Sequence, residues 1–104
     1  MESNNEFLKQ YMVEFDVPSP INEDIMELVP AQRDALDMLF AEGKLLCYSV
    51  SLDRSRVWAV MLAESESELL TYIDELPMTP YMDFDYFELM LHNTVHLMPA
   101  MSLN

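Results

Sequence analysis

The residues best suited to chemistry in this chain are acids set among apolar side chains. Glu88 lies between Tyr86 and Met90 on the same side of a predicted last strand. Apolar surroundings raise the pKa of a carboxyl group toward neutrality, where it can act as a general base. His92 lies on the same side about 13 Å further along, so the two side chains could flank a ligand without bonding to each other.

Glu14 is a second candidate acid, near the end of a predicted first strand. In the fold derived below, the first and last strands are neighbours, so Glu14 and Glu88 could approach each other over one cavity. Each candidate also has a structural interpretation. Glu88 could pair with Arg56 of a second copy of the chain, Glu14 could be a solvated strand end, and His92 could be hydrogen-bonded at a strand end.

Aromatic side chains on the predicted strands could line a pocket for a small planar ligand. They are Tyr48, Tyr86 and Trp58, and packing is the alternative role of each. Metal and phosphate chemistry have no support, because the chain has one cysteine, Cys47, two histidines without zinc-type spacing and one glycine. We therefore expect neither a metal nor a cofactor.

Size and charge narrow the class of protein. At 104 residues and 51% hydrophobic content the chain should fold as one domain, with a core at about 6–93 and a C-terminal tail over 94–104. A net charge of −14 repels phosphate backbones and argues against a nucleic-acid partner. No apolar run approaches a membrane-spanning length, and the first residues lack a secretory pattern. With a single cysteine, these features favour the cytoplasm.

The elements that must position these residues follow from hydrophobic periodicity and capping signals. Alternation predicts a first strand over 7–17. A helix follows, capped by Ser19 or Asn22, kinked or broken at Pro30 and ended by Gly43.

A hairpin, a second helix and a last strand follow. Runs at 45–52 and 56–63 predict a hairpin, and a capping box of Ser65 and Glu68 predicts the next helix. Pro77 and Pro80 end that helix, and the last strand runs from Met82 to about His92. The order is β-α-β-β-α-β, an α+β ferredoxin-like fold with both helices on one face of a four-stranded antiparallel sheet.

Both faces of that sheet are predicted to be largely apolar, although the helices cover only one of them. Trp58, Val60 and Leu62 share one side of the third strand, and Leu46, Tyr48, Val50 and Leu52 share one side of the second. An exposed apolar face of that size is unusual in a monomer. We therefore expect two sheets to pack face to face, in a homodimer or a larger closed oligomer.

Two segments carry a resemblance to a known family. "LPMTPYMDFDYFELMLH" (76–92) resembles the C-terminal segment of muconolactone delta-isomerases, in which a Leu-Pro, a Pro-Tyr-Met-Asp and a later His recur. "LVPAQRDALDMLFAEGKLL" (28–46) resembles other proteins of the same dimeric α/β barrel superfamily, including the YciI-like group. That group commonly has a histidine where this chain has Gln32, which argues against YciI-type histidine chemistry.

The resemblance implies a dimeric α/β barrel and a cofactor-free isomerase that moves one proton on a small unsaturated lactone or organic acid. In such an enzyme Glu88 with Glu14 would move the proton, and His92 or Arg56 would hold the ligand's carboxylate. Tyr81 of the Pro-Tyr-Met-Asp motif would contact the ligand or shape a turn. The alternative is a non-catalytic ligand-binding or assembly module with the same barrel, and a third interpretation is a cofactor-free monooxygenase.

Overall fold

The computed structural model describes residues 8–17 and 22–92. Its elements follow in the order β1 (Lys9–Asp16), α1 (Glu23–Met26), α2 (Val29–Ala41), β2 (Leu45–Val50), β3 (Arg56–Ala63), α3 (Glu66–Asp74), the 3-10 helix η2 (Thr79–Tyr81) and β4 (Asp83–Leu89). The predicted β-α-β-β-α-β order is confirmed, with the first helix divided in two. The predicted tail over 94–104 and the alternative cap Ser19 lie outside the described residues.

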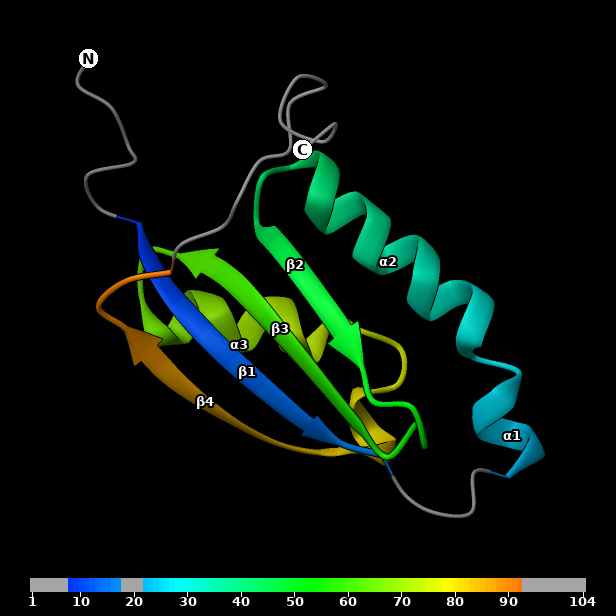
Figure 1. Ribbon diagram of the computed structural model, residues 1–104. Helices are drawn as coiled ribbons and strands as arrows, with labels where there is room; N and C mark the ends of the chain where they lie inside the picture. The colour runs from blue at the N-terminus through cyan, green and yellow to red at the C-terminus, as the bar shows by residue number, and fades with distance from the viewer. Residues whose placement is uncertain (1–7, 18–21, 93–104) are drawn as a thin grey trace, which may run out of the picture.

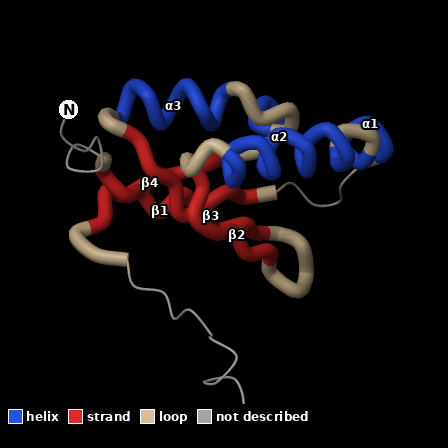
Figure 2. The backbone as a smooth tube through the Cα atoms, turned by 90° about the horizontal axis from the view of Figure 1, so that it is seen from above, coloured by secondary structure: helices blue, strands red, loops and turns tan. Residues whose placement is uncertain are grey.

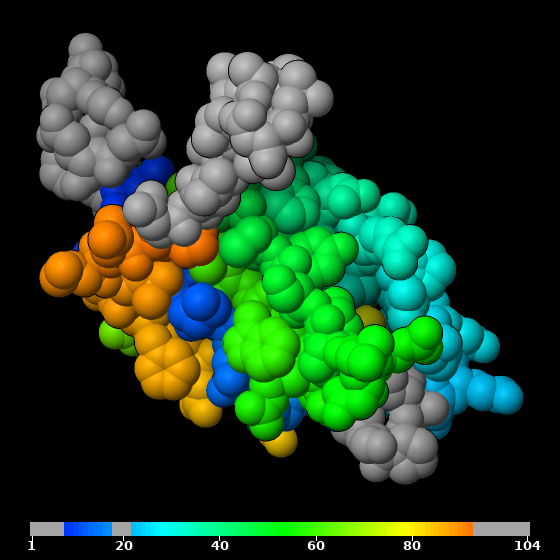
Figure 3. Space-filling model, in the orientation of Figure 1, coloured from blue at the N-terminus to red at the C-terminus, as the bar shows by residue number. Residues whose placement is uncertain are grey.

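The strands form one antiparallel sheet in the order β2-β3-β1-β4 (Figure 1). β1 is a central strand, paired along its length with β3 on one side and with β4 on the other. The three helices cover the same face of the sheet (Figure 2). The second face carries no helix, and we call it the open face; it is turned toward the viewer in Figure 3.

The first helix is broken where its proline predicts. Asn22 caps α1, because its Oδ1 accepts a hydrogen bond from the backbone N–H of Ile25 at 2.9 Å. Pro30 then falls in the first turn of α2, where a missing N–H costs no helical hydrogen bond. Gly43 follows α2 with a φ of 74°, which is the left-handed cap expected of it.

α3 begins at the predicted capping signal. Ser65 Oγ accepts from the backbone N–H of Glu68 at 3.1 Å, and Glu68 Oε1 accepts from the N–H of Glu64 at 2.9 Å. At the other end, the hydroxyl of Thr79 donates to the carbonyl of Ile73. This contact closes the turn that leads the chain from α3 toward β4.

The core lies between the helices and the sheet. β1 and β3 supply its centre, and the inward side chains are those that the alternation assigned to one side: Tyr11, Val13 and Phe15 of β1 with Ala59 and Met61 of β3. Leu39 of α2 and Leu69 and Ile73 of α3 pack against them. The two-residue period of a strand therefore decides which side chains enter the core.

The predicted sides of β2 are confirmed for Tyr48 and Val50, which share one face, and wrong for Leu46. A bulge shifts its register between Leu45 and Cys47, so that Leu45, not Leu46, shares the core face with Tyr48. Leu52 lies beyond the end of the strand and is fully exposed in the turn.

The predicted end of the last strand is also wrong. β4 ends at Leu89, and His92 lies in the irregular segment beyond it. His92 therefore does not continue the alternation on which its place beside Glu88 was predicted.

Candidate functional site

A cavity of about 430 Å³ lies between the helix layer and the sheet, at the end where β1 and β2 stop and β3 begins. Its walls come from those strand ends, from α1 and α2, from the β2–β3 turn and from the segment before β4. The lining residues are Val17, Met26, Val29, Gln32, Arg33, Leu36, Tyr48, Val50, Arg54, Val57, Met78 and Met82. The walls are thus apolar, with three methionine thioethers among them, apart from one amide, one phenol and two guanidinium groups.

Contacts between distant parts of the chain hold this cavity open. Gln32 Oε1 accepts a hydrogen bond from the backbone N–H of Met78 at 3.0 Å, which ties α2 to the segment before β4. The rings of Phe40 and Tyr48 lie 5.9 Å apart between centroids, which ties α2 to β2. Such a preformed, mostly apolar hollow with a few polar groups is typical of small-molecule sites.

The charge in this cavity is opposite in sign to that of the whole chain. Arg33 and Arg54 line it, and no aspartate, glutamate or histidine does so among the described residues. Neither guanidinium forms an ion pair with another described residue, whereas Lys44 pairs with Glu42, and Arg56 with acids of β1. In a chain with 19 acids and a net charge of −14, this local positive charge favours an anionic ligand.

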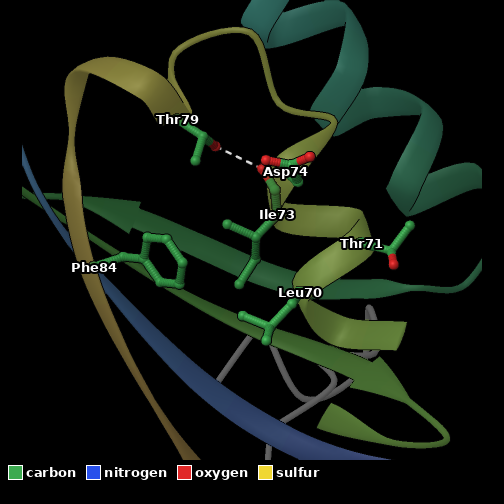
Figure 4. Close-up of a pocket in the computed structure, with 6 residues that line it drawn as sticks. All are labelled: Leu70, Thr71, Ile73, Asp74, Thr79 and Phe84. Carbon is green, nitrogen blue, oxygen red and sulfur yellow. Dashed lines mark hydrogen bonds between the residues drawn. The ribbon is translucent and has the colours of Figure 1, made fainter. Parts of the chain in front are cut away.

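Two shallower hollows are less suited to a ligand. Figure 4 shows the first, of about 330 Å³, where Leu70, Ile73 and Phe84 point toward one another between α3 and β4. Asp74 and two threonines complete its lining. The second, of about 260 Å³, includes Tyr81, a predicted ligand contact, beside Asp16 and Asp83. Neither hollow is lined by a basic residue among those described.

Three predicted site residues come together on the open face, away from the cavity. Trp58 Nε1 donates a hydrogen bond to Glu14 Oε2 at 2.9 Å, and Arg56 Nη1 lies 3.6 Å from the same oxygen. Arg56 Nε also lies 3.2 Å from Asp16 Oδ1. Glu14 is therefore held as a structural acceptor between a tryptophan and an arginine.

The expected convergence of Glu14 and Glu88 is wrong. In the pairing of β1 with β4, Glu14 lies opposite Asp85 and Glu88 lies opposite Tyr11. Tyr11 points into the core while Glu14 is on the open face, so the two carboxylates are on opposite faces of the sheet. β1 and β4 are adjacent as predicted, but the register of their pairing puts the two carboxylates on different faces.

Glu88 lies in a small polar group at the edge of the core that the sequence did not predict. Tyr86 donates a hydrogen bond to Glu66 at 2.8 Å, and its ring meets that of Tyr11 edge-on. The Tyr11 hydroxyl is buried and has no hydrogen-bond partner among the described residues. Burial, with the nearby carboxylates of Glu88 and Glu66, raises the pKa of Tyr11, and the bond to Glu66 raises the pKa of Tyr86.

Of the predicted ligand contacts, Tyr48 alone lines the large cavity. Sequence reasoning missed Arg33 and Arg54 there, and marked Gln32 only as a departure from a relative. A scattered arginine has no sequence signal of its own. Arg54 did stand in a predicted turn, but its left-handed backbone, with a φ of 65°, could not be foreseen for a residue that is not glycine.

The fold places the chain in the class of ferredoxin-like α+β proteins that includes the dimeric α/β barrels. It superposes on the crystal structure of muconolactone isomerase with a TM-score of 0.67 and 20% identity, over 85% of this chain and 96% of that chain. It also superposes on the crystal structure of MtbAldR with a TM-score of 0.56 and 9% identity, over 95% of this chain and 64% of that one.

The sequence identifies the family within that class. Residues 6–100 match the family model described as muconolactone delta-isomerase, so the chain belongs to that family. Comparison with curated proteins finds no significant match.

Two further findings concern the described part of the chain. No helix there is long and apolar enough to cross a membrane. Within the same residues, no three or more histidine, cysteine or acidic side chains are grouped so as to hold a metal ion.

Proposed function

We propose that the protein binds a small unsaturated organic acid or lactone, of the kind a muconolactone isomerase acts on, in the cavity between α2 and the sheet. The observation that carries this proposal is the lining of the cavity, which is mostly apolar with two guanidinium groups. Its volume of about 430 Å³ lies within the range of about 300–1,000 Å³ usual for small-ligand sites. Membership of the isomerase family supports the ligand class.

The test is to fill the cavity and measure binding. Leu36 lines the cavity on α2, and Leu36→Trp should remove the space that the ligand occupies. Met38, on the exposed side of the same helix, provides the matched control Met38→Trp. We expect muconolactone titrated in a calorimeter to bind the wild type and the control, and to bind Leu36→Trp much more weakly. Equal binding to all three would mean that the ligand site is elsewhere.

Isomerisation of the bound ligand is the second candidate, and family membership favours it. Moving a proton beside a carbonyl needs a base within hydrogen-bond reach of the ligand. The described cavity lining contains no carboxylate or imidazole, so Glu88 or Glu14 would have to act from another site, or a neighbouring copy would have to supply the base. Binding without turnover is therefore our primary expectation.

Deuterium exchange separates the two candidates. A catalyst would introduce deuterium from heavy water into muconolactone as it isomerises, and NMR of the ligand would detect it. Loss of that exchange in Glu88→Gln or Glu14→Gln would identify the base. Oxygen uptake with a quinol, measured on the same preparation, would instead support the monooxygenase interpretation. The single cysteine agrees with a proposed cytoplasmic location, which cell fractionation would test.

A further inference from the structure

We infer that Arg54 and Arg33 bind the carboxylate of the ligand at the cavity, so that the protein selects an organic anion over its neutral ester. This inference rests on the proposed ligand-binding function and deepens it. The carboxylate contact thereby moves from His92 and Arg56, which the family resemblance suggested, to two other residues. Arg56 is engaged with Glu14 and Asp16 on the open face.

The β2–β3 turn holds the backbone of Arg54 in an unusual conformation. With a φ of 65°, Arg54 is left-handed, a region that residues other than glycine rarely occupy. Its N–H donates to the carbonyl of Ser51 at 2.9 Å, and the N–H of Ser51 donates to the carbonyl of Arg56 at 2.9 Å. Backbone strain of this kind persists where the surroundings enforce it, and it is often found at ligand sites.

Asp53 enforces that conformation from the centre of the turn. One of its carboxylate oxygens accepts three hydrogen bonds: from Ser51 Oγ at 2.7 Å, from Ser55 Oγ at 2.7 Å and from the N–H of Ser55 at 3.0 Å. Ser51 Oγ in turn accepts from the N–H of Arg56 at 3.0 Å. The only acid within the turn is thus occupied by its serines, while the neighbouring Arg54 lines the cavity.

The two arginines reach the cavity from opposite layers. Arg33 belongs to α2 in the helix layer, and Arg54 to the turn at the end of the sheet. Neither is ion-paired with a described residue, although acids outnumber bases almost four to one in the chain. Guanidinium groups match the planar carboxylate and can bind it in a bidentate manner.

The rest of the lining indicates that the part of the ligand away from its carboxylate is apolar. Val29, Leu36, Val50 and Val57 offer aliphatic walls without hydrogen-bonding side chains. An acid with a short apolar or unsaturated body would place that body against these walls and its carboxylate between the arginines. A strongly polar or polyanionic ligand would leave its polar groups unsatisfied against these side chains.

The experiment compares acids with their methyl esters at pH 7.5. The probes are muconolactone, benzoate and sorbate, each beside its ester, titrated calorimetrically into the full chain. We expect the wild type to bind at least one acid about tenfold or more tightly than its ester, as the loss of a charge-assisted hydrogen bond predicts. Arg54→Gln and Arg33→Gln should each remove most of that preference without weakening the ester.

Two further variants keep this test clear. Arg54→Gly removes the guanidinium and suits the left-handed backbone, so it should fold at least as well as the wild type and still lose the preference for the acid. Lys9→Gln removes one exposed positive charge in β1, away from the cavity lining, and should leave the preference unchanged.

Equal affinity for acid and ester in the wild type, or an unchanged preference in both arginine variants, would overturn the inference while leaving ligand binding in the cavity intact. Absence of binding for every acid and ester would overturn the inference and the proposed function together.

Discussion

At the scale of single residues, chemical type was a weaker guide than position in the register. Glu14 and Glu88 are both strand carboxylates among apolar neighbours, yet one accepts a hydrogen bond from Trp58 on the open face and the other lies opposite the buried Tyr11. Because side chains alternate between faces, an odd offset in pairing separates two acids that neighbouring strands would otherwise bring together. The paired carboxylates expected of an isomerase are therefore not formed by these two residues within one chain.

The buried hydroxyl of Tyr11 gives a prediction at this scale. The Tyr11 side chain is fully buried, and its hydroxyl has no partner among the described residues. Leaving such a group unsatisfied costs about 1–3 kcal/mol, so Tyr11→Phe should raise the free energy of unfolding by about 1 kcal/mol. Urea unfolding measures it, with Tyr81→Phe, an exposed tyrosine, as the matched control. A clear loss of stability in Tyr11→Phe would mean that the hydroxyl has a bonding partner in solution.

Ionisation of the Tyr11 hydroxyl at alkaline pH gives a second prediction for the same residue. Burial and two carboxylates raise the pKa of Tyr11 above its ordinary value of 10.0, so the folded state holds the phenolic proton more tightly than the unfolded chain. The resulting stabilisation is complete below pH 10 and is lost as the pH rises through the folded-state pKa. Tyr11→Phe should therefore lose less stability than the wild type when urea unfolding is repeated between pH 9 and pH 11.

At the scale of elements, the β2–β3 turn is the feature that places Arg54 at the candidate site. Hairpin turns usually supply left-handed positions with glycine or asparagine, but this one uses Arg54 and stabilises it with hydrogen bonds from two serines to Asp53. The prediction of a hairpin over 45–63 is confirmed in its strands. The conformation of the turn depends on side-chain bonds that short-range turn rules do not contain.

Acid should loosen this turn before the core responds. Hydrogen bonds from Ser55 and Ser51 lower the pKa of Asp53 from 3.8 to about 2. The folded-state pKa is depressed, so the stabilisation is present above pH 3.8 and is lost as the pH falls toward 2. The protection of the Arg54 and Arg56 amides against hydrogen exchange, relative to the unfolded chain at the same pH, should therefore fall over that interval in the wild type. In Asp53→Ala both amides should already exchange fast at pH 5, and slow exchange in that variant would show that the carboxylate does not hold the turn.

At the scale of the whole molecule, the open face remains the feature that calls for a partner. By register it carries Met12, Trp58, Leu62, Phe87 and Leu89, each at least partly exposed, across three strands, with no helix above them. Each large side chain removed from water contributes about 1.5–3 kcal/mol, so several together can exceed the cost of association. We therefore keep the homodimer or larger closed oligomer as a proposal.

A charge on the open face should disrupt that assembly. Phe87 is 56% exposed on β4, and Phe87→Asp would bury a carboxylate if two open faces meet. Met38→Asp, at a residue 61% exposed on α2, adds the same charge away from the face. Light scattering should give at least twice the chain mass of 12.1 kDa for the wild type and the control, and a lower mass for Phe87→Asp. A wild type that scatters as a single folded chain would contradict the proposal.

Much of the fold, and little of the site, could be predicted from the sequence. The helix break at Pro30, the cap at Gly43 and the capping box at Ser65 are local signals, and each is found where it was expected. The cavity is different, because Gln32, Tyr48 and Arg54 meet there from three elements. No local signal relates residues so far apart in the chain.

The sequence by itself determined the order of elements, the two-residue alternation of β1 and β3 and the family, because these depend on backbone preferences and hydrophobic spacing along short stretches. Tertiary structure alone decided the bulge at Leu45–Cys47, the faces taken by Glu14 and Glu88, and the meeting of Arg33 with Arg54 at one cavity. Those features depend on the register between strands and on which helix covers which strand end. The strand register and the placement of the helices over the sheet depend on the free energy of packing the whole core, to which residues distant in sequence contribute.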